Sequence, residues 1–240
     1  ALILSLALNS QAAVTVDPMF SNHMVLQREL AVPVWGKSEP GEKVKVSFRK
    51  QSKETVANEK GEWIIKLDPL SLGPASELTV EGKAKITFKD VLVGEVWLGS
   101  GQSNMAWSVD RSYDPDLESL TAKFPNIRLI SVPPVGTQEP QKDFNGEWVA
   151  ASPESVMSFS AVGFFFGRTL HQAIDVPVGL IDNAWGGSAA EAWIRRDLLG
   201  KLPTAAPYMA TWKQTETNYD HEKTMATYDT RLKKWQTAAA

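Results

Sequence analysis

The fold prediction starts from Val91-Leu-Val-Gly-Glu-Val-Trp-Leu-Gly-Ser-Gly-Gln-Ser-Asn-Met105. Its first part, Val91–Leu98, is largely apolar, which is typical of a strand buried on both faces of a parallel sheet. Gly99 and Gly101 follow, and glycine permits the tight or left-handed backbone of a turn. Ligands bind beyond the carboxyl ends of the strands in such sheets, so Ser103 is the candidate functional residue of this turn.

Downstream segments extend this strand into a predicted α/β sheet. Residues 126–132 and Val178–Ile181 resemble further strands. Residues 160–174 carry apolar groups at spacings of three and four, which indicates a helix that Pro177 ends. The order strand, helix, strand predicts a parallel α/β sheet. We also expect a helix to begin after Ser103, with its N-terminal N–H groups directed at a developing negative charge.

Residues 14–92 are predicted to form a small antiparallel β-sandwich domain that precedes this sheet. Lys43-Val-Lys-Val-Ser-Phe48 alternates polar and apolar residues, which is the period of a half-buried strand. Turn signals at Glu39-Pro-Gly-Glu42 and Asn58-Glu-Lys-Gly61 separate several such short segments. The chain therefore divides into this domain and a domain spanning residues 93–240.

The second domain is predicted to be incomplete. Residues 211–236 repeat aromatic and apolar groups at multiples of three or four and should form one amphipathic helix that packs on the rest of the domain. A sheet usually has about five or six strands, and only about three can be placed here. The sequence thus predicts a partial α/β domain that lacks its C-terminal part.

Composition excludes several functional classes. The formal net charge of -3 offers no clustered basic field, so nucleic acid is not an expected partner. The chain has no cysteine, which excludes disulfides and thiolate chemistry. Its three histidines, His23, His171 and His221, lack metal-ligand spacing, so no metal site is expected. No segment is long and apolar enough for a membrane span, and nothing in the sequence sets an oligomeric state.

The N-terminal residues 1–13 resemble the end of a signal peptide. Ala1-Leu-Ile-Leu-Ser-Leu-Ala-Leu8 is apolar, and the small residues Ala12 and Ala13 suit a cleavage point. A buried N-terminal strand or helix is the alternative. The first interpretation predicts a secreted or periplasmic protein.

Three interpretations compete for Gly99–Met105. An ordinary Gly/Ser loop is the simplest. A dinucleotide-binding loop would need a third glycine, where Asn104 stands. A nucleophile turn would present Ser103 at the sheet edge, although the Gly-x-Ser-x-Gly form fails because position 105 is Met.

A second glycine-rich loop, with Gly186 and Gly187 in Trp185-Gly-Gly-Ser188, follows the strand at Val178–Ile181. Two loops that follow two parallel strands should lie side by side at one sheet edge. The Gly-Gly pair would let backbone N–H groups approach a ligand closely, and taken alone it would be just a turn.

Together these motifs resemble the sialate O-acetylesterases, within the SGNH hydrolases. Gly101-Gln-Ser-Asn-Met105 is similar to their nucleophile block, and Trp185-Gly-Gly-Ser188 with Glu191-Ala-Trp193 is similar to their second block. Phe20-Ser-Asn-His-Met-Val-Leu-Gln-Arg28 resembles part of their N-terminal β domain. The resemblance runs from about residue 17 to about residue 197, and residues 198–240 would be a helical insertion.

The resemblance implies a serine carboxylesterase that removes O-acetyl groups from carbohydrate without a metal or organic cofactor. Ser103 would be the nucleophile, and its own N–H with that of Gly187, or alternatively Gly186, would form the oxyanion hole. Gln102, Asn104 and Glu191 would support the site. The implied substrate is 9-O-acetylated sialic acid, for whose carboxylate Arg195 and Arg196 are candidates; an acetylxylan-type esterase or a non-catalytic carbohydrate-binding protein are the alternatives.

The sequence departs from the family in two blocks. Neither the Gly-Glu-Ser-Asn-like block nor an Asp-x-x-His-like block occurs in these 240 residues, so the catalytic histidine, its acid partner and the third-block Asn are not in this chain. A serine hydroxyl is a poor nucleophile without an adjacent base. We therefore expect the 240-residue chain to be inactive and the complete protein to be active.

Overall fold

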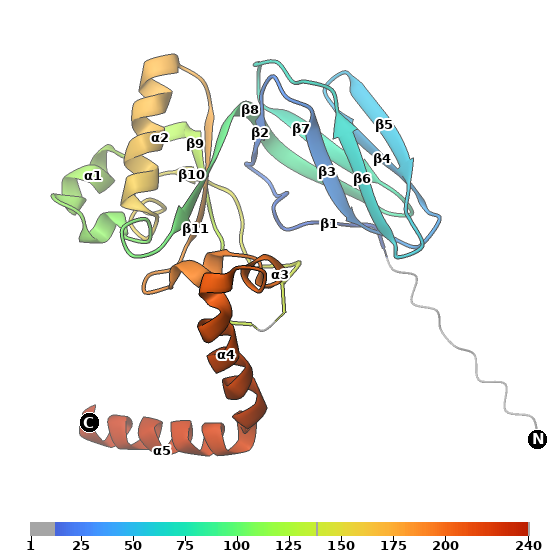
Figure 1. The fold of residues 1–240 in the computed structure, drawn as a ribbon. Coiled ribbons are helices and arrows are strands. Elements are labelled where there is room, and N and C mark those ends of the chain that lie inside the picture. The colour runs from blue at the N-terminus through green and yellow to red at the C-terminus, as the bar shows by residue number, and fades with distance from the viewer. Residues whose placement is uncertain (1–12, 138, 240) are drawn as a thin grey trace, which may run out of the picture. The chain divides into compact units, whose positions relative to one another are not determined.

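The computed structural model describes residues 13–137 and 139–239, so the segment predicted as a signal peptide lies outside the described residues except for Ala13. The chain forms two compact units, residues 1–188 and 189–240. Figure 1 shows their elements. The first unit contains β1 (Thr15–Val16), β2 (Val25–Gln27), β3 (Val32–Lys37), β4 (Lys43–Phe48), β5 (Gln51–Val56), β6 (Glu62–Leu67), β7 (Ser76–Glu81), β8 (Lys85–Gly101), η1 (Val109–Arg111), α1 (Pro115–Thr121), β9 (Phe124–Ser131), β10 (Val149–Ala151), α2 (Ala161–Ile174) and β11 (Val178–Ala184).

The antiparallel part of this unit has two layers. One is a three-stranded sheet in the order β1-β3-β6, and the other contains β7, β4 and β5. In β4, alternate side chains such as Val44 and Val46 are fully buried because the pleat turns every second residue toward the opposite layer. Val34, Ile65 and Leu78 belong to the same hydrophobic core.

Strand β8 joins the antiparallel part to the α/β part. Its first half pairs antiparallel with β7, and its second half, Glu95–Gly101, pairs parallel with β11. β11 in turn pairs parallel with β9, and β10 closes that edge as an antiparallel strand. The predicted α/β class with preceding antiparallel structure is confirmed. The boundary between residues 92 and 93 falls inside β8, and the division into two domains there stays a prediction.

Helix α2 packs on the core through a face that includes the predicted apolar positions Phe165 and Leu170 but not Val162, Phe166 and Ile174. Its buried residues are Ala161, Phe164 and Gly167, whereas Val162 and Phe166 are exposed by 48% and 42%. Gly167 lies against Leu180 of β11, with no room for a side chain between them. A second core, which includes Phe164 and Leu180, forms under this contact.

No helix begins directly after Ser103, and that expectation was wrong. Residues 102–106 form turns with one helical bond, from the Ala106 N–H to the Gln102 carbonyl. The chain then extends to a bridge between Ser108 and Ser160. The backbone at this bridge pairs as a strand does and so does not continue as a helix.

The second unit is helical and was also predicted only in part. It contains η2 (Ala190–Trp193), α3 (Arg196–Leu199), η3 (Pro203–Ala205), α4 (Ala206–Asn218) and α5 (His221–Ala239). The single helix predicted over 211–236 is therefore two helices, because the Asp220 carboxylate caps a new helix by accepting the Lys223 N–H at 3.0 Å. The aromatic side chains predicted to pack are largely exposed, including Tyr228 and Trp235. None of the helices in the described residues could cross a membrane.

Candidate active site

The nucleophile turn leaves the end of β8 with an unusual backbone. Gly101 has φ +136°, a conformation that side-chain-bearing residues rarely adopt. Its carbonyl accepts the Trp185 N–H at 2.9 Å, which ties the ends of β8 and β11 together. Ser103, two residues on, is exposed at this sheet edge.

The two glycine-rich loops lie side by side, as the sequence predicts. Ala184 at the end of β11 is in register with Gly101 at the end of β8. A Cβ placed on Gly186 would lie only 3.9 Å from the Cα of Ser103. Gly187 has φ +80° and open space around it, so a ligand atom could approach its backbone. The parallel pairing of β8 and β11 thus gathers Ser103, Gly186 and Gly187 at one place.

Gln102 holds the serine through two hydrogen bonds. Its Oε1 accepts the Ser103 Oγ–H at 2.5 Å and the Ser103 N–H at 2.8 Å. Gln102 Oε1 thus accepts hydrogen bonds from both the predicted nucleophile and one predicted oxyanion donor. A substrate acyl oxygen would compete with it for the Ser103 N–H. Asn104 is exposed beside it. The supporting roles of Gln102 and Asn104 stay predictions.

The three histidines make their hydrogen bonds away from the turn. His23 contacts Asp90 at 2.7 Å, His171 contacts the Val176 carbonyl at 2.7 Å, and His221 contacts Tyr219 at 3.2 Å. No cluster of three metal-binding side chains occurs in residues 13–137 and 139–239. Within that part of the chain, the turn therefore has a candidate nucleophile and oxyanion donors but no histidine base bonded to it.

Sequence reasoning missed Asp182, which sits near the end of β11. Its carboxyl lines an otherwise largely apolar cavity of about 280 Å³ under the nucleophile turn, together with Trp97, Met105 and Phe166. Burial raises the pKa of the Asp182 carboxyl to about 6. The sequence signal that could have identified Asp182 is a carboxylate at the end of a predicted buried strand.

The remaining predicted site residues belong to the second unit. Glu191 and Trp193 lie in η2. Arg195 pairs with Asp197 through Nη2 at 2.9 Å, and Arg196 contacts Glu216 at 3.4 Å. Both arginines therefore already face carboxylates of their own unit.

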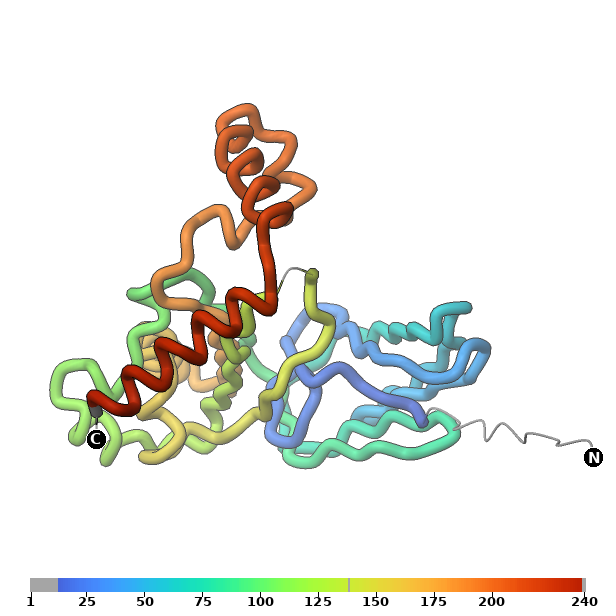
Figure 2. Tube along the Cα trace, turned by 90° about the horizontal axis from the view of Figure 1, so that it is seen from below, coloured from blue at the N-terminus to red at the C-terminus, as the bar shows by residue number. Residues whose placement is uncertain are grey.

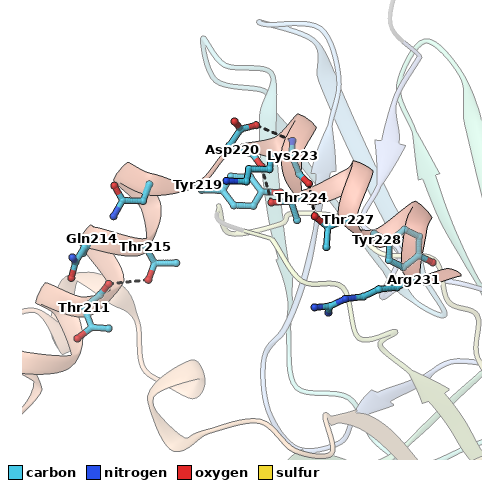
Figure 3. Close-up of a pocket in the computed structure, with 11 residues that line it drawn as sticks. Thr211, Gln214, Thr215, Tyr219, Asp220, Lys223, Thr224, Thr227, Tyr228 and Arg231 are labelled. Carbon is cyan, nitrogen blue, oxygen red and sulfur yellow. Dashed lines mark hydrogen bonds between the residues drawn. The ribbon is translucent and has the colours of Figure 1, made fainter. Parts of the chain in front are cut away.

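The second unit also has an open cavity of about 770 Å³ along the bend between α4 and α5 (Figure 3). Threonines line much of it, and Figure 3 shows Tyr219, Tyr228 and Arg231 around it. The threonine hydroxyls donate to carbonyls of their own helices, as Thr215 does to Thr211 and Thr227 does to Lys223. None of the predicted site residues lines this cavity.

Comparison with known proteins identifies relatives of the chain. Residues 93–239 match the family described as carbohydrate esterase, sialic acid-specific acetylesterase. The human sialate O-acetylesterase is 35% identical over 195 residues, which cover 72% of this chain and 37% of that protein. The mouse sialate O-acetylesterase is 32% identical over 200 residues, with coverages of 74% and 37%.

A solved structure supports the same relationship. The crystal structure of a carbohydrate acetylesterase from Xanthomonas citri superposes with a TM-score of 0.75 at 36% identity and covers 79% of this chain and 44% of that chain. The chain thus spans less than half the length of the relatives it matches.

Proposed function

Because this chain belongs to the carbohydrate esterase family of sialic acid-specific acetylesterases, we propose that the whole protein hydrolyses O-acetyl esters of carbohydrates and that Ser103 is its nucleophile. The observation that supports this proposal is the approach of the Gly186 backbone to Ser103, whose side chain is exposed at the same sheet edge. Preorganised backbone N–H donors stabilise the oxyanion of acyl transfer.

The proposed reaction has two steps. The Ser103 Oγ attacks the acetyl carbonyl carbon, and the carbonyl oxygen becomes an oxyanion that the N–H groups of Ser103 and of Gly187 or Gly186 stabilise. The sugar oxygen then leaves with a proton, which yields an acetyl-serine that water hydrolyses to acetate and free serine. Before attack, the Ser103 Oγ–H and N–H must exchange Gln102 Oε1 for the base and the substrate oxygen.

A base must accept the Ser103 proton. An Asp-x-x-His motif does not occur in these 240 residues, so we propose that another segment of the whole protein contributes the histidine and its acid partner. The 240-residue chain alone should then lack activity.

We propose O-acetylated sialic acid, acetylated at the 9-position, as the substrate. The named relatives support this choice, since the human and mouse proteins are sialate O-acetylesterases. The Xanthomonas citri protein, a carbohydrate acetylesterase, supports the broader class of acetylated sugars. Residues 1–13 support secretion or a periplasmic location as a further proposal, and N-terminal sequencing of the mature protein would test it.

The test is acetate release by the natural-length protein and its Ser103→Ala variant, with 9-O-acetylated sialic acid and acetylated xylan as substrates. We expect release from the sialic acid to fall at least about 10³-fold in the variant. Ser71→Ala is the matched control, because Ser71 is an exposed serine outside both glycine-rich loops. Release from xylan alone would redirect the substrate assignment, and sugar binding without release by either protein would favour a non-catalytic binding protein.

A further inference from the structure

We propose that Met105 is a positioning residue that anchors the nucleophile turn, residues 102–106, to the Ser160 hydroxyl and to Gly99. This inference rests on the proposed function, because the anchored turn is the one that presents Ser103 to the acetyl carbonyl. Met105 acts through the backbone of the turn and takes no part in making or breaking a bond.

Backbone hydrogen bonds fix the two ends of this turn. Before it, the Gly101 carbonyl accepts the Trp185 N–H at 2.9 Å, which ties the turn to the loop after β11. After it, the Trp107 carbonyl accepts the Ala161 N–H at 2.8 Å, which ties the turn to the start of α2. Between these ends the turn can still shift as a unit, unless one of its side chains holds it to the interior.

Met105 makes this contact with the interior. Residues 102–104 are exposed, whereas Met105 is partly buried. The Ser160 Oγ donates to the Met105 Sδ at 3.5 Å, and the same Oγ accepts the Gly163 N–H at 3.0 Å. Ser160 is only 2% exposed, and a buried hydroxyl whose proton is unpaired costs free energy. The thioether, although a weak acceptor, therefore pairs the Ser160 proton and couples the turn to the N-terminus of α2.

The Met105 side chain also lies against the backbone of β8. A Cβ placed on Gly99 would be 3.2 Å from the Met105 Sδ and 3.8 Å from its Cγ. A Cβ placed on Gly101 would be 3.8 Å from the Met105 Cβ. Distances below about 4 Å are direct contacts, so the glycine-rich end of β8 gives Met105 a seat that a side chain at Gly99 would narrow.

Packing alone does not fix the position of Met105. The side chain borders the largely apolar cavity of about 280 Å³, which Trp97, Phe166 and Leu180 also line. Methionine is unbranched and flexible and adapts to irregular space, so the cavity offers the side chain other positions. The Ser160 hydroxyl is the directional contact that selects the observed one.

The first test measures kcat/KM of the natural-length protein for nitrophenyl acetate. Ser103 is two residues from Met105, and a misplacement of about 1 Å can cost about 10²-fold in rate. We expect Met105→Ala to lower kcat/KM by about 10- to 100-fold. Met105→Leu, which keeps most of the apolar side chain, should rescue the activity to within about fivefold of the wild type.

Met157→Ala is the matched control for this test. Met157 is also a partly buried methionine, and it packs on the second hydrophobic core. Its truncation should lower the thermal unfolding midpoint but leave kcat/KM within about twofold of the wild type. Unchanged activity in Met105→Ala, or an equal fall in Met157→Ala, overturns the proposal.

The second test combines Ser160→Ala with Met105→Leu and does not depend on whether Met105→Ala folds. Ser160→Ala removes the donor to Met105 and also the helix cap on the Gly163 N–H. The loss of the cap is common to both backgrounds, so it cancels in a double-mutant cycle. We expect Ser160→Ala to lower kcat/KM about fivefold in the wild type but less than about twofold in Met105→Leu. Equal falls would mean that Ser160 acts only as a cap and would contradict the proposal.

A third measurement distinguishes failure of this proposal from failure of the proposed function. In the natural-length protein with ¹³C-labelled methionine methyl groups, Ser160→Ala should shift the NMR resonance of the Met105 methyl group. The methyl resonance of Met225, an exposed residue of α5, should not move. An unmoved Met105 resonance overturns the anchoring whether or not the protein is an esterase. A shifted resonance in a protein that releases no nitrophenol would support the anchoring and count against the esterase assignment alone.

Discussion

At the scale of single residues, an ion pair with one buried partner holds β8 to β9. The Arg128 side chain is only 5% exposed, and its Nη1 donates to Asp90 Oδ2 at 2.8 Å and to the His23 carbonyl at 3.0 Å. Burial raises the pKa of Asp90, but hydrogen bonds from Arg128 and His23 outweigh it, so the pKa is lowered overall. The folded protein thus favours the charged carboxylate of Asp90, which pairs with the buried guanidinium of Arg128.

Asp90→Asn should destabilise the protein, because it leaves the Arg128 charge without its anion. We expect a loss of about 1–3 kcal/mol in the free energy of unfolding at pH 7, toward the lower end because Asp90 is 38% exposed and partly screened. Asparagine also tolerates the positive φ of 55° at this position. Urea denaturation of wild type and variant measures the difference.

The pH dependence of this difference follows from the sign of the shift. A lowered folded pKa means that the stabilisation is present above the ordinary aspartate pKa, about 4, and is lost as the pH falls through the folded pKa. The difference in the free energy of unfolding between wild type and Asp90→Asn should therefore be smaller at pH 3 than at pH 7. An equal loss in the free energy of unfolding at pH 3 and pH 7 would contradict the stabilising role of the Asp90 carboxylate. Asp143→Asn, in an exposed loop, should have the same free energy of unfolding as the wild type at both pH values.

Neither Asp90 nor Arg128 could be selected from the sequence. They are 38 positions apart and lie in different strands, and no local pattern distinguishes a paired buried arginine from the surface arginines that are far commoner. Ser103 could be selected from the sequence because Gly99 and Gly101 precede it directly after an apolar strand. Asp182 was not, because the burial that raises the pKa of its carboxyl arises from tertiary packing.

At the scale of elements, the pairing of β8 with β11 positions the site. Gly94 sits where β11 approaches β8, and the adjacent Glu95 N–H bonds to the Pro177 carbonyl at 2.9 Å. A Cβ on Gly94 would lie 1.9 Å from that carbonyl oxygen. The close approach of the two strands therefore depends on the absence of a side chain.

Gly94→Ala should separate β8 from the start of β11. We expect a loss of about 3 kcal/mol or more in the free energy of unfolding, because the obstacle is backbone and cannot rotate away. Gly136→Ala is the control, since its added Cβ would only reach ordinary contact with Trp185 at 3.6 Å. Equal urea midpoints for wild type and Gly94→Ala would show that the two strands can separate without a loss of stability, which would contradict this prediction.

The sequence predicted elements where periodicity was strong. The strands at 91–98, 126–132 and 178–181 and the helix at 160–174 all occur, because burial imposes apolar patterns on them. Strand β5, Gln51-Ser-Lys-Glu-Thr-Val56, was missed because it has no buried residue and is defined by its pairing with β4. The break before α5 had a local signal, Asp220 as a helix cap, that the longer apolar repeat obscured.

At the scale of the whole molecule, the two units differ in how they are stabilised. Figure 2 traces the chain from the antiparallel strands into the α/β part and on to the helices of residues 189–240. The first unit has two extensive hydrophobic cores, whereas α5 exposes Met225, Tyr228 and Trp235. Helices of this kind draw most of their stability from packing, so the first unit should dominate the cooperative unfolding that urea measures.

The central claim is that the whole protein carries out acyl transfer on Ser103. The most direct measurement is covalent labelling of the natural-length protein with a fluorophosphonate, followed by intact mass and peptide mapping. We predict one adduct, located on Ser103, that is absent in Ser103→Ala and retained in Ser71→Ala, which changes an exposed serine outside both loops. No adduct in a folded natural-length protein, or an adduct on a different serine, would contradict the account.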